Sequence, residues 1–309
     1  MSMSDFSLPP GIEIFERGWL SANNIFLFSD HKAALVDTGY CTHQYLTVEL
    51  VKNALLQQGL PTLNQIVNTH LHSDHCGGNA ALSKIYHPEI FIPGAEASAV
   101  QAWNEDLLSY RNLGQECPRF VHTHVLIPGK EIILGLYPWK ILAAPGHDPY
   151  SVMLYQADHR ILISADALWE DGFGVIFPEL WGESGFEEVA QTLDLIESLP
   201  IALVIPGHGK SFTDVATALK VARSRLDYLV SDPDRNARHG AKVLLKYKLL
   251  EWRSIEIQRL TQWIINTPAL SHAARQLNLT IDEMASWLPQ ALVKANAARI
   301  DGQHLVNVD

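Results

Sequence analysis

A turn rich in histidine and aspartate, at residues 69–78, restricts what this chain can form more than any other stretch. Four ligand-type residues lie within six positions: His70, His72, Asp74 and His75. Neutral imidazole and carboxylate are ligands that zinc and similar metals take in proteins. Residues 65–68 before the turn are predicted as a buried strand, and residues 77–80 after it as the start of a helix. This pattern indicates a metal site rather than a histidine-rich surface loop.

The spacing within the turn allows the four side chains to serve two metals. Alternate residues of an extended segment point to the same face, so His70 and His72 can bind one ion together. Asp74 and His75 follow around the bend, where they can reach a second ion. The turn therefore predicts one end of a two-metal site.

Three further ligand-type residues each follow a predicted strand. His147 comes after residues 139–143 on a Pro-Gly turn, and His208 repeats that pattern after residues 202–205. Asp166 comes directly after the strand at residues 160–164. Loops on a rigid sheet are where binding residues usually lie. We expect these three side chains to join the turn in one site.

Taken together, these residues resemble the metallo-β-lactamase-fold hydrolase superfamily, and Asp37-Thr38-Gly39 matches the upstream aspartate motif of that family. The resemblance covers residues 12–214 and is closest to the glyoxalase II-like branch. It implies an α+β fold, a four-layer αββα sandwich with a two-metal site along one edge of the sheets. We expect a catalytic domain at residues 1–230 and a mainly helical, winged-helix-like module at residues 231–309.

The resemblance also implies a role for each matched residue. His70, His72 and His147 would bind the first metal, Asp74, His75 and His208 the second, and Asp166 would bridge them. Asp37 would fix a ligand histidine by a hydrogen bond. Asp74 would also orient the attacking water, whose pKa two cations about 3.5–4 Å apart would lower toward neutrality. The cofactors expected are two divalent ions, with zinc favoured and iron or manganese left open.

The residue at the bridging position narrows the reaction. An aspartate there, Asp166, resembles the glyoxalase II, lactonase and phosphodiesterase branches and differs from β-lactamases with a cysteine ligand. A thioester would suit a site without an obvious general acid, because a thiolate with a conjugate-acid pKa of about 8.5 leaves without a proton. The main hypothesis is a hydrolase of thioesters or related esters and lactones. A phosphodiesterase or nuclease, and a non-catalytic protein that keeps the metals, are the alternatives.

Aromatic and polar residues near the ligands are candidates for the substrate pocket. A helix is predicted over residues 95–110, and an aromatic stretch follows Asp166. Two polar residues follow His147 and His208 at short range. The candidates are Trp103, Tyr150, Trp169, Phe173, Phe177 and Lys210.

Composition limits the partners. The net charge of −11 disfavours a general nucleic-acid or anionic-membrane surface. The module from His239 onward has eight Lys/Arg and six Asp/Glu, so 8 − 6 = +2, which is weak for a DNA reader. Packing over the active-site mouth or a homodimer contact suits it better. Three cysteines, no signal-peptide pattern in residues 1–10 and no long apolar run predict a cytoplasmic protein acting on a small acyl substrate.

Overall fold

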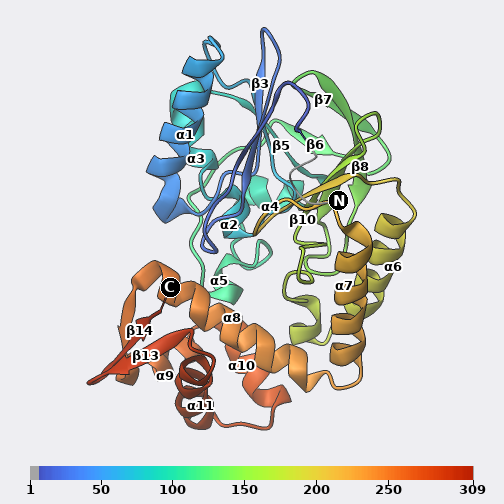
Figure 1. The fold of residues 1–309 in the computed structure, drawn as a ribbon. Coiled ribbons are helices and arrows are strands. Elements are labelled where there is room, and N and C mark those ends of the chain that lie inside the picture. Colours follow the sequence, from blue (N-terminus) through green and yellow to red (C-terminus); the bar gives the residue numbers. More distant parts are fainter. Residues whose placement is uncertain (1–6, 309) are drawn as a thin grey trace.

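Two β-sheets packed face to face form the centre of the structure, a computed structural model that describes residues 7–308 (Figure 1). Residues 1–6, part of the stretch assessed for a signal peptide, lie outside the described residues. The first sheet has the order β1-β2-β3-β4-β5-β6. Its strands are β1 (Ile12–Phe15), β2 (Asn24–Phe28), β3 (Ala33–Val36), β4 (Gln65–Val67), β5 (Glu89–Pro93) and β6 (His124–Leu126).

The second sheet has the order β11-β10-β9-β8-β7. Its strands are β7 (Glu131–Leu134), β8 (Tyr137–Ala143), β9 (Val152–Gln156), β10 (Ile161–Ala165) and β11 (Leu203–Pro206). An apolar core lies between the sheets, with Val36 and Val67 from the first sheet and Trp139, Ile141 and Ile163 from the second. Strands with apolar residues on both faces, such as β3 and β10, are buried on both sides.

Helices cover the outer face of each sheet (Figure 1). On the first sheet lie α1 (Gln44–Gln57) and α3 (Asn79–Tyr86), which bury residues such as Val51 and Leu82 against strand residues such as Ile66. On the second lie α6 (Phe186–Glu197) and α7 (Val215–Val230), which bury Leu193 and Leu226. These layers form the αββα sandwich that the resemblance implies, and they confirm the α+β fold class.

The segment at residues 95–110 differs from the long helix predicted for it. The structure has a short helix α4 (Ala97–Ala102), a turn, and a second short helix α5 (Tyr110–Leu113). Trp103 ends α4 with a positive φ of 50°, and the Asn104 side chain accepts hydrogen bonds from the backbone N–H groups of Asp106 and Leu107. Asparagine offers the backbone this local alternative to a helix, so the helical spacing of apolar residues does not decide the structure here.

A helical module follows α7 and lies below the sandwich in Figure 1. Its helices are α8 (Asp234–Trp252), α9 (Ile257–Ile265), α10 (Pro268–Gln276) and α11 (Ile281–Lys294). A small sheet, β12 (Ser254–Glu256), β14 (His304–Asn307) and β13 (Ala298–Asp301), completes it, and β13 and β14 form a terminal hairpin. The module has its own apolar core, centred on residues such as Leu244, Leu270 and Leu288.

Helix α8 ties the module to the sandwich. Its Glu251 carboxylate accepts a hydrogen bond from the Tyr40 hydroxyl at 3.0 Å and pairs with Lys248 at 2.6 Å. Tyr40 follows the Asp37-Thr38-Gly39 segment, so these contacts fix α8 beside the edge of the sheets where the ligand-type residues lie. Because Lys248 is buried and Glu251 is partly buried, removing either would leave a poorly compensated charge.

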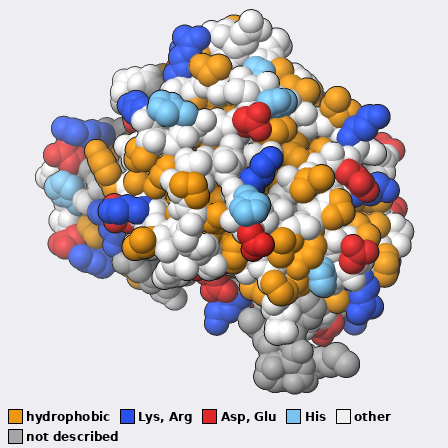
Figure 2. All heavy atoms as spheres, turned by 90° about the horizontal axis from the view of Figure 1, so that it is seen from above, with side chains coloured by type: hydrophobic (Ala, Val, Ile, Leu, Met, Phe, Trp, Pro, Cys, Tyr) orange, Lys and Arg blue, Asp and Glu red, His pale blue; other side chains and the backbone are white. Residues whose placement is uncertain are grey.

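The lengths of the helices can be compared with that of a membrane span, and one face of the surface is seen in Figure 2. Within residues 7–308, every helix is too short or too polar to cross a bilayer. On the face seen from above, basic, acidic and apolar side chains are interspersed, and the visible described residues form no single-sign patch (Figure 2).

Candidate metal centre

The ligand-type residues lie on segments that each follow a strand, with Asp74 and His75 in the short helix α2 (Ser73–Cys76) after β4. His70 follows β4 and Asp37 follows β3, which is parallel to β4. Asp166 and His208 follow the parallel strands β10 and β11. Parallel strands end at the same edge of a sheet, which is where α/β proteins bind ligands. The structure thereby brings seven side chains, from sequence positions as far apart as 70 and 208, to one edge of the sandwich.

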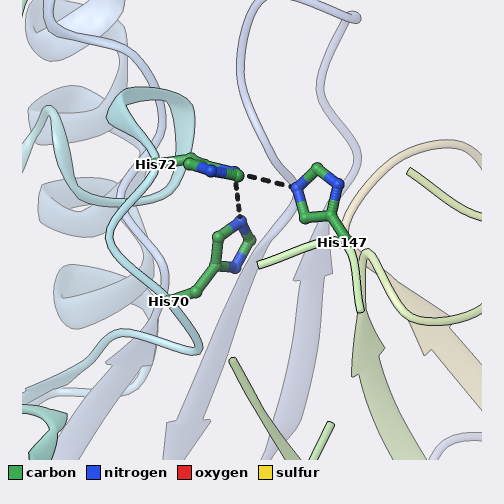
Figure 3. A group of neighbouring side chains, drawn as sticks. All are labelled: His70, His72 and His147. Carbon is green, nitrogen blue, oxygen red and sulfur yellow. Dashed lines mark hydrogen bonds between the residues drawn. The ribbon is translucent and has the colours of Figure 1, made fainter. Parts of the chain in front are cut away.

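Three histidines form the first ligand group (Figure 3). Nδ1 of His72 lies 3.0 Å from Nε2 of His70 and 2.8 Å from Nε2 of His147. His70 and His72 come from the turn after β4, and His147 comes from the loop after β8. The grouping is the one that the resemblance implies for the first metal.

In His70 and His147, the hydrogen bond made by Nδ1 determines whether Nε2, which faces His72, carries a proton or a lone pair. Nδ1 of His147 lies 2.6 Å from the backbone carbonyl of Val175, which only accepts, so this nitrogen is protonated. The Thr69 hydroxyl donates to Asp37 and so accepts from Nδ1 of His70 at 3.2 Å. Nε2 of both His70 and His147 therefore carries a lone pair directed at His72. A single N–H at His72 cannot satisfy both lone pairs, whereas a cation between the rings would.

The second ligand group contains Asp74, His75 and His208. The Nε2 atom of His208 lies 3.1 Å from Oδ2 of Asp74. Nδ1 of His75 donates to the buried Asp37 carboxylate at 2.7 Å, which directs Nε2 of His75 to the interior of the site. That Nε2 is buried and has no hydrogen-bond partner among the described residues. A buried ring nitrogen without a partner, facing the carboxylates of the site, fits a metal ligand.

Asp166 lies between the two groups. Its Oδ2 is 3.3 Å from Nε2 of His147 and 3.9 Å from Nε2 of His208, and its Oδ1 is 3.5 Å from Nε2 of His75. Asp37 holds His75 in the manner expected of a residue that fixes a ligand histidine. These residues fit a pair of divalent ions. Six ligands form two groups of three, and the Asp166 carboxylate is a seventh ligand that the two groups would share.

The electrostatics of the site also favour cations. Burial, reinforced by the neighbouring His147, lowers the pKa of His72 to about 3, so its ring is neutral and free to bind at neutral pH. Burial alone would lower the pKa of His75, but the carboxylates of Asp166 and Asp37 outweigh it and raise that pKa. Burial would raise the pKa of Asp166, but the surrounding histidines lower it well below its usual value. The Asp166 carboxylate is thus ionised and the His72 ring neutral, which is the state that a metal requires of these ligands.

Gly207 provides a test of how tightly the site is built. A Cβ on Gly207 would overlap Oδ1 of Asp166 and approach Cε1 of His75 to 3.0 Å. We expect Gly207→Ala to displace Asp166 and lower metal affinity by about tenfold or more, measured by competition with a chromogenic chelator. Gly18→Ala is the matched control, because a Cβ at Gly18 meets open space. Equal metal affinity in the two variants would contradict this account.

The metal centre opens into one cavity of about 450 Å³. The sandwich contributes ligands, together with Trp19, Trp169, Val175 and Phe177. Helix α8 forms another part of the wall, and its lining residues are His239, Lys242, Val243, Leu244, Lys246, Tyr247 and Leu250. A cavity of this size, mainly apolar with a few polar groups, suits a small molecule.

Two of the candidate pocket residues lie where the sequence predicts them. The Phe177 ring contacts His72 and His147, with centroids 5.2 and 5.4 Å apart. Trp169 packs edge-on against His208 at 5.5 Å, and its Nε1 donates to Asp166 at 3.3 Å. Both residues line the cavity.

The other four candidates lie elsewhere. Trp103 packs against Tyr110 and Phe120 in the core beneath the first sheet, because the turn after α4 directs it inward. Phe173 is fully buried in the core between the second sheet and its helices. Tyr150 and Lys210 are exposed and are not among the residues that line the cavity. Closeness in sequence to a ligand histidine does not determine which way these two side chains point.

The sequence analysis missed the pocket residues that come from outside the ligand motifs. Trp19, on the loop between β1 and β2, stacks on His208 with centroids 5.4 Å apart. Tyr247 places its hydroxyl 3.5 Å from Oγ of Ser73, next to the ligand Asp74. The helical spacing of residues 241–250 predicts a helix, and packing over the active-site mouth is one of the two placements expected for the module, but nothing in the sequence shows which side chains of this helix line the cavity.

Comparison with known proteins agrees with this geometry. Residues 17–208 match the metallo-beta-lactamase superfamily. The chain is 28% identical over 204 residues to "Probable metallo-hydrolase YqgX" of Bacillus subtilis, covering 65% of this chain and 90% of that protein. It is 26% identical over 201 residues to the hydroxyacylglutathione hydrolase of Brucella anthropi, covering 65% of this chain but only 64% of that enzyme.

Two solved structures are similar over almost the whole chain. A metallo-beta-lactamase family protein from Thermus thermophilus has a TM-score of 0.57 at 18% identity and covers 98% of this chain and 100% of that one. A beta-lactamase domain protein from Burkholderia ambifaria has a TM-score of 0.59 at 18% identity and covers 98% of this chain and 94% of that one. At this identity they show the fold alone. The family match, by contrast, extends over more than half of the sequence, so the chain belongs to the metallo-beta-lactamase superfamily and is a metal-dependent hydrolase.

Proposed function

We propose that this protein hydrolyses a small acyl substrate, a thioester or a related ester or lactone, at a two-metal site. The observation that carries the proposal is the position of the ligand groups at one end of a cavity with mainly apolar walls. An acyl chain can lie along such walls while its carbonyl carbon reaches the ligands. Helix α8 forms one wall of the cavity, whose size suits a small molecule better than a nucleic-acid strand.

His70, His72 and His147 would hold one ion and Asp74, His75 and His208 the other, with Asp166 shared. When bound, the two ions would lower the pKa of a water molecule and polarise the substrate carbonyl. Zinc is the metal we favour for this mixture of imidazole and carboxylate ligands, with iron or manganese as the alternatives.

The chain's own residues position the reactants. The Asp74 side chain lines the cavity, and its carboxylate can hold a proton of the attacking water. Burial, and then the Asp74 carboxylate, raise the pKa of Tyr247 well above its usual value, so its hydroxyl stays protonated and can donate to the substrate oxygen. Phe177 and Trp169 shield the ligands from bulk water. A thiolate needs no proton as it leaves, which suits a site whose neutral donor is a tyrosine.

Initial rates on a small panel would test the proposal. The panel contains the hexanoyl thioester of N-acetylcysteamine, a γ-lactone and bis(4-nitrophenyl) phosphate, each with metal-loaded and chelator-treated protein. We expect the thioester to be the best substrate, with kcat/KM at least about tenfold above that of the phosphodiester, and its turnover to need metal. Metal-dependent turnover of the phosphodiester alone would contradict the acyl assignment and favour the phosphodiesterase alternative.

A further inference from the structure

A group of basic side chains lies on the cavity wall away from the metal ligands. Arg225 comes from α7, and His239 and Lys242 come from α8. Tyr247 is on the same helix, and its hydroxyl lies beside Ser73 at the metal end of the cavity. Distances along α8 from the metal end can therefore be counted from Tyr247. At a rise of about 1.5 Å per residue, Lys242 lies about 7.5 Å and His239 about 12 Å further along the α8 axis.

Arg225 is the most constrained member of the group. One of its guanidinium nitrogens, Nη2, donates to Nε2 of His239 at 2.8 Å, and its Cζ lies 5.0 Å above the Phe173 ring. Burial lowers its pKa. Among residues 7–308 it forms no ion pair, and a half-buried guanidinium without a carboxylate is costly to keep.

Lys242 is equally without a counter-ion in the part of the chain that the structure describes. The acids among the described lining residues are Asp74 and Asp166, both of which belong to the metal site. Other cations nearby are paired: Arg223 with Asp194 and Glu197 at 2.7 and 2.6 Å, and Lys248 with Glu251 at 2.6 Å. Arg225 and Lys242 thus line the cavity without a counter-ion among the described residues, in a chain whose net charge is −11.

His239 does not supply a charge of its own. Burial, with smaller effects from Arg225 and Lys242, lowers its pKa to about 3, so the ring is neutral and its Nε2 accepts the hydrogen bond from Arg225. It holds the guanidinium in place. Between this group and the metal end, Val243 and Leu244 of α8 and Leu292 of α11 form apolar wall, and Lys246 donates hydrogen bonds to the backbone carbonyls of Ala297 and Val308.

We infer that Lys242 and Arg225 form an anion subsite, and that the substrate is an acyl thioester or ester with a carboxylate or phosphate at the end remote from the scissile bond. The hydrolysis in this inference rests on the proposed function, whereas the binding of an anion by Lys242 and Arg225 does not depend on it. The anion can belong to either half of the substrate: a carboxylate that ends the acyl chain, or a phosphate on the thiol.

Matched substrates separate these sources. The neutral reference is hexanoyl-N-acetylcysteamine, the acyl-carboxylate probe is the adipoyl monothioester of the same thiol, and the phosphate probe is hexanoyl-coenzyme A. We expect Lys242→Met to lower kcat/KM for an anionic probe by about tenfold, mainly through KM, and to change the neutral reference by less than about twofold. Loss on the adipoyl probe identifies an acyl carboxylate, and loss on the coenzyme A probe alone identifies a thiol-side phosphate.

Two further variants guard against a merely structural effect. Lys242→Arg is expected to keep the preference for the anionic probe, and Arg223→Met, two residues from Arg225 but paired on the surface, is expected to behave as wild type. An equal loss on the neutral and anionic substrates, or no loss on either anionic probe, would overturn the inference.

A binding measurement keeps the inference separate from turnover. Trp19 and Trp169 line the cavity, so their fluorescence can follow binding of adipic acid monoamide, of hexanamide as its neutral counterpart, and of coenzyme A. We expect Lys242→Met to weaken the monoamide or coenzyme A by about tenfold and to leave hexanamide unchanged. If no thioester is hydrolysed, the proposed function fails while this titration still decides the subsite; identical binding by wild type and variant would reject it.

Discussion

Replacing Asp166 with alanine is expected to lower kcat/KM by about 10³-fold and to reduce metal content by about one ion per chain. The reason is the position of this carboxylate, with one oxygen 3.3 Å from Nε2 of His147 in the first ligand group and the other 3.5 Å from Nε2 of His75 in the second. Its loss removes a ligand from both groups and leaves the facing imidazoles without a negative charge. Elemental analysis of protein purified without added metal, together with initial rates, measures both effects.

Asp171→Ala is the matched control for this variant. Asp171 lies five residues further along the same segment and is exposed, so its loss should change neither metal content nor rate. Thermal melting of both variants would show whether they remain folded. Full metal content in Asp166→Ala would mean that this carboxylate is not shared between the two groups, and the proposed arrangement would then be wrong.

The convergence of the candidate ligands on one site could be predicted from the sequence because each of them belongs to a short local pattern. His70, His72, Asp74 and His75 share one turn, and His147 and His208 each follow a strand and a Pro-Gly pair. A strand end fixes where the next residue lies, and parallel strands end together, so local signals suffice to place these side chains at one edge.

The walls of the cavity could not be predicted in the same way. Tyr247 contacts Ser73, 174 positions away in the sequence. Arg225 contacts His239 because α7 and α8 pack against each other. No local pattern encodes these contacts. Trp103 shows the opposite failure: its apolar spacing suited a helix, but the Asn104 side chain stabilises a turn that buries the ring in the core.

Removing the metals is expected to destabilise the protein strongly. Each ion that binds only the folded state at 1,000 times its dissociation constant stabilises it by about 4 kcal/mol, so two independent ions contribute about 8 kcal/mol. Without them, the lone pairs of His70 and His147 again face His72 with nothing between them. Urea unfolding of metal-loaded and chelator-treated protein measures the difference. Equal unfolding midpoints would contradict a metal pair held by these ligands.

The metal-free protein should also lose stability as the pH falls from about 6.5. His72 and His239 have folded-state pKa values of about 3 against an ordinary 6.5, so below pH 6.5 the unfolded chain binds protons that the folded chain does not. Each ring then lowers the free energy of unfolding by about 1.4 kcal/mol per pH unit until about pH 3. His75 adds no slope in this window, because its pKa is raised and both states carry the proton below 6.5.

His239→Gln isolates one of these contributions, since His239 is outside the ligand groups and a glutamine carbonyl can still accept from Arg225. In the metal-free protein this variant should reduce the slope of unfolding free energy between pH 6 and 4.5 by about 1.4 kcal/mol per unit. The remainder belongs to the ligand histidines and should persist when zinc is added, because an ion on their lone pairs keeps the proton out of the folded state while the unfolded chain still binds it; zinc instead raises the free energy of unfolding across the window. A slope that is the same in wild type and variant would show that His239 is protonated in the folded protein, and the hydrogen bond from Arg225 could not then exist as described.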